Sequence, residues 1–127
     1  MMSIFSSTSF KGEDPWWIDS GASSHMTSKR EFFSFLLSYE GPIKSIYTTN
    51  DEACKIEGVG CIPLCLGSSK KINIEGVLYI PTITKNLLSV GQMVDNGYNV
   101  DFASNECFIR NKGNIVAKGT RLGKLYK

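Results

Sequence analysis

One carboxylate in this 127-residue chain has a setting suited to chemistry. Asp19 follows the apolar residues at 16–18 and is followed directly by Ser20, Gly21 and Ala22. An apolar strand brings its last side chain to the edge of a sheet, a serine hydroxyl hydrogen-bonds locally, and a glycine allows a sharp turn. This pattern predicts an acid–base group rather than a packing residue, and Asp19 is therefore the candidate catalytic residue.

Acid–base chemistry near neutral pH needs a second carboxylate. An isolated aspartate, with a pKa of about 4, is a weak base and carries no proton to donate at pH 7. Two adjacent carboxylates cannot both ionise, so one stays protonated and polarises a carbonyl while the other draws a proton from water. The chain has the length of one domain and a single Asp-Ser-Gly run. The second carboxylate would come from another copy across a two-fold axis, which predicts a homodimer.

The residues around Asp19 resemble a known family. The run Trp-Ile-Asp-Ser-Gly-Ala-Ser-Ser-His-Met at 17–26 is similar to the protease segment of copia-type LTR retrotransposon Gag-Pol polyproteins, a retropepsin-like aspartic protease. Shorter matches follow at 58–60, 77–81, 86–90, 119–121 and 125–126. The resemblance implies a mostly-β fold: a retropepsin-like closed β-barrel or sandwich with one or two short helices and an obligate-dimer active site.

The resemblance also implies a reaction and roles for individual residues. The reaction is cleavage of Gag and Pol polyprotein junctions by a water molecule that an Asp19 pair activates, inside a cytoplasmic virus-like particle and without metal or cofactor. Ser20, Gly21 and Ala22 would support the catalytic turn. A mobile flap and a pocket wall would bind the substrate as an added strand, and the residues implied for them are Thr48, Thr49, Asn50, Asp51, Leu87 and Leu88. Ser89 departs from the family pattern, because retroviral proteases have a glycine there.

The spacing of apolar residues predicts the elements that position these groups. Residues 1–15 are expected to be a flexible arm with a short edge strand at Ile4 and Phe5, 16–102 the protease-like core, and 103–127 a C-terminal hairpin extension. This extension either enlarges the dimer interface or begins the next polyprotein segment. Period-two alternation predicts strands at 16–20, 43–48, 54–66, 72–80 and 98–102, with bulges at the glycines of 58–60.

Two capping boxes predict short helices. Ser28 and Glu31 precede Phe32, Phe35 and Leu36 at helical spacing, and this helix would end by 41–42. A second helix is expected to begin at Ser89 with Gln92 and to stop at Asn96-Gly97.

Composition narrows the function classes. The 14 Lys and Arg nearly balance the 12 Asp and Glu, so a nucleic-acid partner is not expected, and the basic residues collected after 109 are interpreted as a solvated surface. No apolar run approaches the roughly 20 residues of a membrane span. The four cysteines lack zinc-ligand spacing and are expected to be buried free thiols in a reducing compartment.

Several alternatives remain beside the protease hypothesis. Asp19 could be an ordinary turn residue, and the domain a catalytically silent protein-binding or dimerisation module. A nucleic-acid-binding β-barrel rests only on the late basic residues. A triad of His25 with Ser23 or Ser24 is disfavoured, because sequence neighbours rarely have triad geometry; His25 is instead expected to pack or cap near the active-site turn. Trp16 and Trp17 are expected to be a core anchor and its half-exposed neighbour.

Overall fold

The computed structural model describes residues 2–4, 16–47, 50–66 and 70–121. Almost all of its regular structure is extended, with a 3-10 turn η2 (Arg30–Phe32) and a short helix α1 (Val90–Asp95). The strands are β1 (Met2–Ile4), β2 (Trp16–Asp19), β3 (Met26–Thr27), β4 (Phe35–Ser38), β5 (Ser45–Tyr47), β6 (Ala53–Lys55), β7 (Gly58–Leu66), β8 (Lys70–Tyr79), β9 (Asn86–Ser89), β10 (Asn99–Phe102), β11 (Glu106–Asn111) and β12 (Asn114–Arg121). The mostly-β architecture predicted from the sequence is confirmed.

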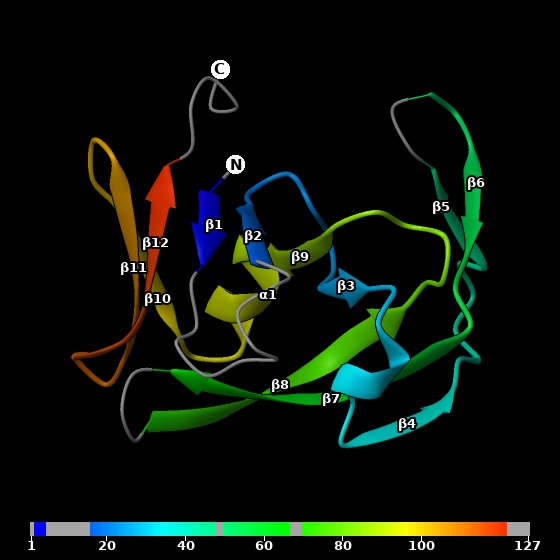
Figure 1. Ribbon diagram of the computed structural model, residues 1–127, viewed down its shortest axis with the longest axis horizontal. Helices are drawn as coiled ribbons and strands as arrows, with labels where there is room; N and C mark the ends of the chain where they lie inside the picture. Colours follow the sequence, from blue (N-terminus) through cyan, green and yellow to red (C-terminus); the bar gives the residue numbers. More distant parts are fainter. Residues whose placement is uncertain (1, 5–15, 48–49, 67–69, 122–127) are drawn as a thin grey trace.

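The strands form one large sheet and one separate hairpin. The ten-stranded sheet has the order β10-β11-β12-β1-β2-β9-β3-β8-β7-β4, and β5 pairs only with β6 (Figure 1). Among the described strands β10 and β4 stand at the two ends of this order, so the sheet is open and the closed barrel expected from the resemblance is not seen. β2 and β9 run parallel in its middle, which places the Asp19 end of β2 beside the start of α1.

The long β7–β8 hairpin carries the pattern that predicted it. Ile62 and Leu64 are register partners of Ile74 and Ile72, and a register shift between Gly60 and Ile62 provides the bulge expected near the glycines. Gly60 lies directly against β4, where a Cβ would overlap the carbonyl oxygen of Phe35. A glycine is therefore required for β4 to pair here.

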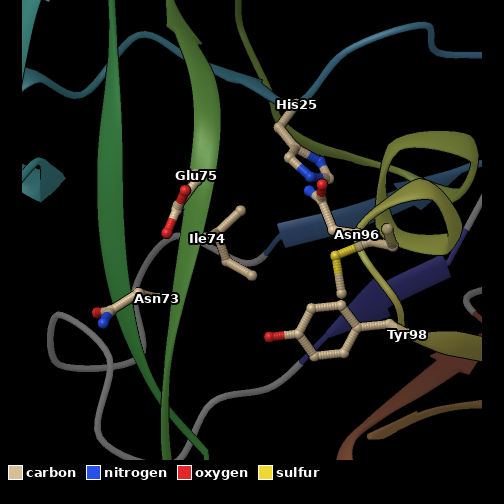
Figure 2. A pocket seen from close by; sticks show the side chains of 7 residues that line it. His25, Asn73, Ile74, Glu75, Asn96 and Tyr98 are labelled. Atoms are coloured by element: carbon tan, nitrogen blue, oxygen red, sulfur yellow. The ribbon is translucent and has the colours of Figure 1, made fainter.

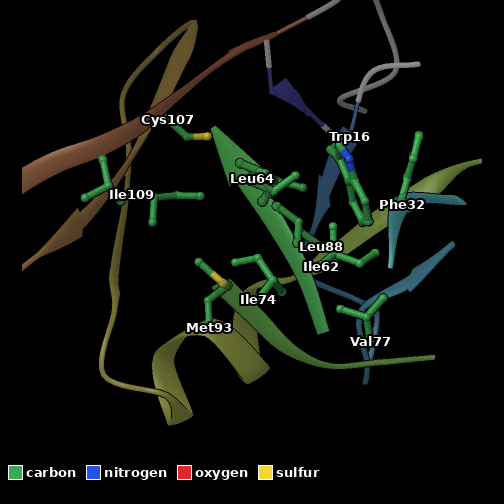
Figure 3. Close-up of a cluster of buried hydrophobic side chains, with 12 residues drawn as sticks. Trp16, Phe32, Ile62, Leu64, Ile74, Val77, Leu88, Met93, Cys107 and Ile109 are labelled. Atoms are coloured by element: carbon green, nitrogen blue, oxygen red, sulfur yellow. The ribbon is translucent and has the colours of Figure 1, made fainter. Parts of the chain in front are cut away.

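Two clusters of buried apolar side chains pack against the sheet and stabilise it. The larger one gathers buried side chains from both halves of the chain, among them Trp16, Ile18, Ile62, Leu64, Leu88, Met93 and Ile109 (Figure 3). Trp16 is 2% exposed and its ring lies 6.2 Å from that of Phe32; Trp17 is half-buried. The smaller cluster contains Met26, Cys54, Ile56 and Ile80, and it anchors the β5–β6 hairpin to the sheet.

The helical segment expected after Ser28 is limited to the 3-10 turn η2, and its extension to 41–42 is wrong, because β4 begins at Phe35. Lys29 caps the short turn η2 without a side-chain hydrogen bond, and the chain then enters β4. β4 pairs with β7 over Phe35↔Cys61 to Ser38↔Gly58, which satisfies backbone groups along a strand instead. Phe35 and Leu37 are exposed while Leu36 lies against Gly58, so period two replaces the helical spacing.

The second helix and the late hairpin are confirmed. The Ser89 Oγ accepts a hydrogen bond from the Gln92 N–H (3.1 Å), and α1 ends before Gly97, whose φ is +94°. β11 and β12 turn at Lys112 and Gly113, both with positive φ, and lie between β10 and β1 in the sheet. Ile4 is paired on both sides, with Trp16 and Gly119, rather than on an edge; Phe5 lies outside the described residues.

Three of the cysteines are as expected: Cys54, Cys61 and Cys107 are buried free thiols, and the side chain of Cys65 lies outside the described residues. Within the described part of the chain, no helix has the length and apolarity to cross a membrane.

Candidate active site

A cleft of about 910 Å³ opens beside Asp19. Its walls come from the end of β2, Met26 of β3, the β5–β6 hairpin, the loop 82–85 and Leu87 of β9. Ile46, Ile83 and Leu87 make part of the lining apolar, and Asn50, Glu52 and Lys85 make part of it polar. The cleft therefore brings one carboxylate next to both apolar and polar surface.

Asp19 is held in a tight turn at the end of its strand. Its Oδ1 accepts a hydrogen bond from the Gly21 N–H (2.8 Å), and its backbone carbonyl accepts one from the Ala22 N–H (3.3 Å). Among the described residues the structure gives Oδ2 no hydrogen-bond partner. Ser20 and Gly21 are exposed at this turn and Ala22 is partly buried. One carboxylate oxygen is thus fixed by the backbone, and the other is available to solvent or ligand.

Ser89 ties this turn to the neighbouring strand. It is the register partner of Asp19 on β9, and its Oγ donates a hydrogen bond to the Ala22 carbonyl oxygen (2.8 Å). The Ser89 Oγ also accepts a hydrogen bond from the Gln92 N–H at the start of α1. The residue that departs from the family pattern is therefore the link between the Asp19 turn and the helix.

The Ser89 N–H, which Gln92 would accept in a capping box, is accepted by His25 instead. The Gln92 side chain does not return to the Ser89 N–H; its Oε1 accepts the His25 N–H (2.9 Å), and its Nε2 donates to the carbonyls of Glu75 and Gly76 (both 3.2 Å). The Ser89 N–H instead donates to His25 Nδ1 (2.9 Å). The only sequence signal was that His25 follows the Asp19 turn closely.

His25 is fully buried and neutral at pH 7. Its exposed fraction is 0%, and burial lowers the pKa of the imidazole from 6.5 to about 4. Because Nδ1 accepts a hydrogen bond, the ring proton is on Nε2, which has no hydrogen-bond partner among the described residues. The ring is packed near the Asp19 turn, as expected, and its Nδ1 accepts a backbone N–H rather than a serine hydroxyl, which excludes the triad arrangement.

A second hydrogen bond, between Thr27 and Asn86, also ties β9 to the segment after Asp19. Thr27 Oγ1 donates to Asn86 Oδ1 at 2.6 Å, and both side chains are buried. This hydrogen bond joins β3 to the beginning of β9, so both ends of β9 are held by side chains from the segment that follows Asp19.

The residues expected to bind substrate have different positions. Thr48 and Thr49 lie outside the described residues. Asn50 lines the cleft, and Asp51 is exposed with a φ of +63° next to it in the β5–β6 connection. Leu87 lines the cleft, whereas Leu88 points into the large core at 2% exposure, because successive strand residues face opposite sides.

The cleft wall also carries the positively charged side chain of Lys85. Lys85 lies with its Nζ 5.2 Å from the ring centroid of Trp17, so an aromatic face orients a cation at the cleft wall. The described residues contain no cluster of three or more His, Cys, Asp or Glu that could hold a metal ion.

The family model and the curated relatives that match this chain agree with one another. Residues 16–98 match the family model described as "Pol polyprotein, beta-barrel domain". Over 115 residues the chain is 27% identical to the retrovirus-related Pol polyprotein from transposon TNT 1-94 of Nicotiana tabacum, and this alignment covers 91% of the chain. It is 31% and 32% identical, over 88% of its length, to the Pol polyproteins from transposons RE1 and RE2 of Arabidopsis thaliana. The chain spans 8% of the length of each of these relatives. No solved structure matches.

Proposed function

Because the chain belongs to the family of Pol polyprotein beta-barrel domains, we propose that it is the aspartic endopeptidase of a copia-type retrotransposon. The proposal rests on one observation: Asp19, at the end of a buried strand, lines a cleft between the β5–β6 hairpin and the loop 82–85. Its substrates are Gag and Pol polyprotein junctions, cleaved within a cytoplasmic virus-like particle.

The mechanism follows from two Asp19 side chains that meet across the two-fold axis of a homodimer. One carboxyl keeps its proton because two carboxylates in contact cannot both ionise. The ionised member takes a proton from a water between them, the water oxygen attacks the scissile carbonyl carbon, and the protonated member gives its proton to the carbonyl oxygen. Collapse of the resulting diol transfers a proton to the amine and breaks the C–N bond. No covalent intermediate is needed.

The cleft supplies the positioning. An extended peptide lying between the hairpin and the loop 82–85 would place alternate side chains against the apolar wall of Ile46, Ile83 and Leu87. The β5–β6 hairpin pairs with no other strand of the described sheet. Its strands pack on the smaller apolar cluster through Ile46 and Cys54, while Asn50 and Glu52 in its connection line the cleft. This placement supports the role of a flap over a bound substrate.

The test is cleavage of a peptide that spans a Gag–Pol junction of the same element. Asp19→Asn keeps an oxygen that accepts the Gly21 N–H but removes the ionisable group, so cleavage is expected to fall to the uncatalysed background. Asp95→Asn, an exposed carboxylate at the end of α1, is the matched control and is expected to retain full activity. Activity per chain is also expected to fall on dilution below the dimer Kd. Equal cleavage by the Asp19→Asn protein would contradict the proposal.

One observation favours a second candidate, a catalytically silent binding or dimerisation module. The Asx turn gives Asp19 a structural role that needs no chemistry. This candidate predicts that the junction peptide binds and stays intact at high protein concentration and mildly acid pH.

A further inference from the structure

Two segments that are far apart in the sequence, the loop after Asp19 and the β9–α1 junction, meet at His25. The loop after Asp19 carries the ring, and the ring Nδ1 accepts the Ser89 N–H at the β9–α1 junction. The backbone N–H of His25, not its ring, donates to Gln92 Oε1 of α1. Figure 2 shows the ring above a small cavity of about 220 Å³, with Asn73, Ile74 and Glu75 of β8 opposite. His25 thus makes two long-range hydrogen bonds, one through its ring and one through its backbone N–H. A side chain that only filled space would not need the ring hydrogen bond.

We propose that His25 is a positioning residue for Asp19: its Nδ1 lone pair fixes the backbone of Ser89, and Ser89 in turn holds the active-site turn. This inference rests on the proposed function for its activity readout, although its structural readouts do not.

The path from the imidazole to Asp19 has three hydrogen bonds. The Ser89 N–H donates to Nδ1 (2.9 Å), the Ser89 Oγ donates to the Ala22 carbonyl (2.8 Å), and the Ala22 N–H donates to the Asp19 carbonyl (3.3 Å). Because β2 and β9 are parallel neighbours, a rotation of the Ser89 peptide would move its hydroxyl away from Ala22. The turn that fixes Oδ1 of Asp19 would then lose its outer support.

The first of these hydrogen bonds forms only while Nδ1 is unprotonated and keeps its lone pair. A proton on Nδ1 would point at the Ser89 N–H and set two donors against each other. Burial opposes that proton and lowers the pKa of His25 to about 4. The titratable residues that share the cavity are Glu75 from β8 and Tyr98, which follows α1. A Glu75 carboxylate would favour the charged ring, so a control must test its influence.

Two substitutions separate the lone pair from the shape of the ring. His25→Asn places an amide oxygen near the position of Nδ1 and cannot titrate, whereas His25→Leu has similar bulk and no acceptor. For His25→Leu, kcat is expected to fall roughly tenfold or more, since a buried N–H is left unsatisfied, while KM changes less than about twofold. His25→Asn is expected to restore most of kcat, and Glu75→Gln is the control that leaves it within about twofold of wild type.

Readouts in the Asp19→Asn protein decide the same question without catalysis. Imidazole ¹⁵N shifts should show the proton on Nε2, and the Ser89 amide shift should titrate with His25, with a midpoint near pH 4. Hydrogen exchange at the Gly21 and Ala22 amides should be about tenfold faster in His25→Leu but not in His25→Asn.

The proposal is overturned if folded His25→Leu leaves both kcat and these exchange rates unchanged, if His25→Asn is as impaired as His25→Leu, or if the proton lies on Nδ1. If His25→Leu does not fold, the wild-type tautomer and the Ser89 titration decide. If the wild-type chain cleaves no peptide, the proposed function fails, and hydrogen exchange still tests the positioning role.

Discussion

Asp19 and Ser89 are register partners on two parallel strands, so the carboxylate and the hydroxyl that braces its turn are placed by one ladder of backbone hydrogen bonds. β2 supplies the acid and β9 supplies the support. Any change that shifts one strand against the other by a residue would send these side chains to opposite faces of the sheet. The geometry of the site therefore depends on strand register as much as on the identity of its residues.

Ser89→Ala is expected to lower both stability and activity. It removes the cap on the Gln92 N–H and the donor to the Ala22 carbonyl, at a cost of about 1–2 kcal/mol in the free energy of unfolding. Urea unfolding of the variant measures this loss. Ser38→Ala, at an exposed position of β4, is the control and should stay within about 0.5 kcal/mol of wild type. A Ser89→Ala protein as stable as the control would contradict the anchoring role.

Stability is expected to fall as the pH is lowered from 6.5 to 4 because of His25. In the unfolded chain the imidazole has an ordinary pKa of about 6.5, whereas burial lowers the pKa in the folded protein to about 4. In this window the unfolded state binds more protons, so stability rises with pH and then levels off above 6.5; the full effect is about 3 kcal/mol. Urea unfolding at pH 4.5 and 7.5 measures it. His25→Asn removes this contribution, so an unchanged pH dependence in that variant would assign the effect to other groups.

Leu87 and Leu88 are expected to respond in opposite ways to truncation. Leu88→Ala removes a fully buried side chain from the large core and should cost about 3 kcal/mol of unfolding free energy. Leu87→Ala removes part of the cleft wall and should raise KM for the junction peptide, with a smaller loss of stability. Each variant is the control for the other, and the comparison is contradicted if Leu88→Ala is the one with the larger KM and the smaller stability change.

Gly60→Ala is expected to destabilise the sheet by about 2 kcal/mol or more, because the new methyl group would overlap the Phe35 carbonyl and β4 would have to move. Gly91→Ala is the matched control: a Cβ there would come no closer than 3.9 Å to the Ser89 Oγ, and alanine favours α1 by up to about 1 kcal/mol. Thermal unfolding should give a lower Tm for the first and an equal or higher Tm for the second. Equal Tm changes would show that β4 pairing is not limited by Gly60.

The parts of the fold that the sequence predicted are those set by local pattern. The strand before Asp19, the bulge near Gly60 and the Ser89-capped helix depend on neighbours within a few residues. The segment after Ser28 was misassigned because Phe32, Phe35 and Leu36 have helical spacing, whereas pairing with β7 decides the structure. A strand partner far along the chain outweighs local propensity at such a position.

The candidate site also has parts that the local sequence predicts and parts that depend on distant contacts. The Asp19 turn was predicted because every residue it needs is adjacent in the sequence. The role of His25 was only partly predicted, since its acceptor nitrogen meets a backbone amide 64 positions away. The opposite facing of Leu87 and Leu88 follows from alternation, but which of them lines the cleft depends on where the loop 82–85 lies.

The parallel pairing of β2 with β9 also sets an order of events during synthesis. Asp19 is synthesised before β9, so the Ala22 carbonyl has no donor until the Ser89 hydroxyl, 67 positions later, has been made. Such distant closures form late in folding, after the local hairpins between them. The Asp19 turn therefore lacks its support from Ser89 until translation has passed the β9–α1 junction and β9 has paired with β2.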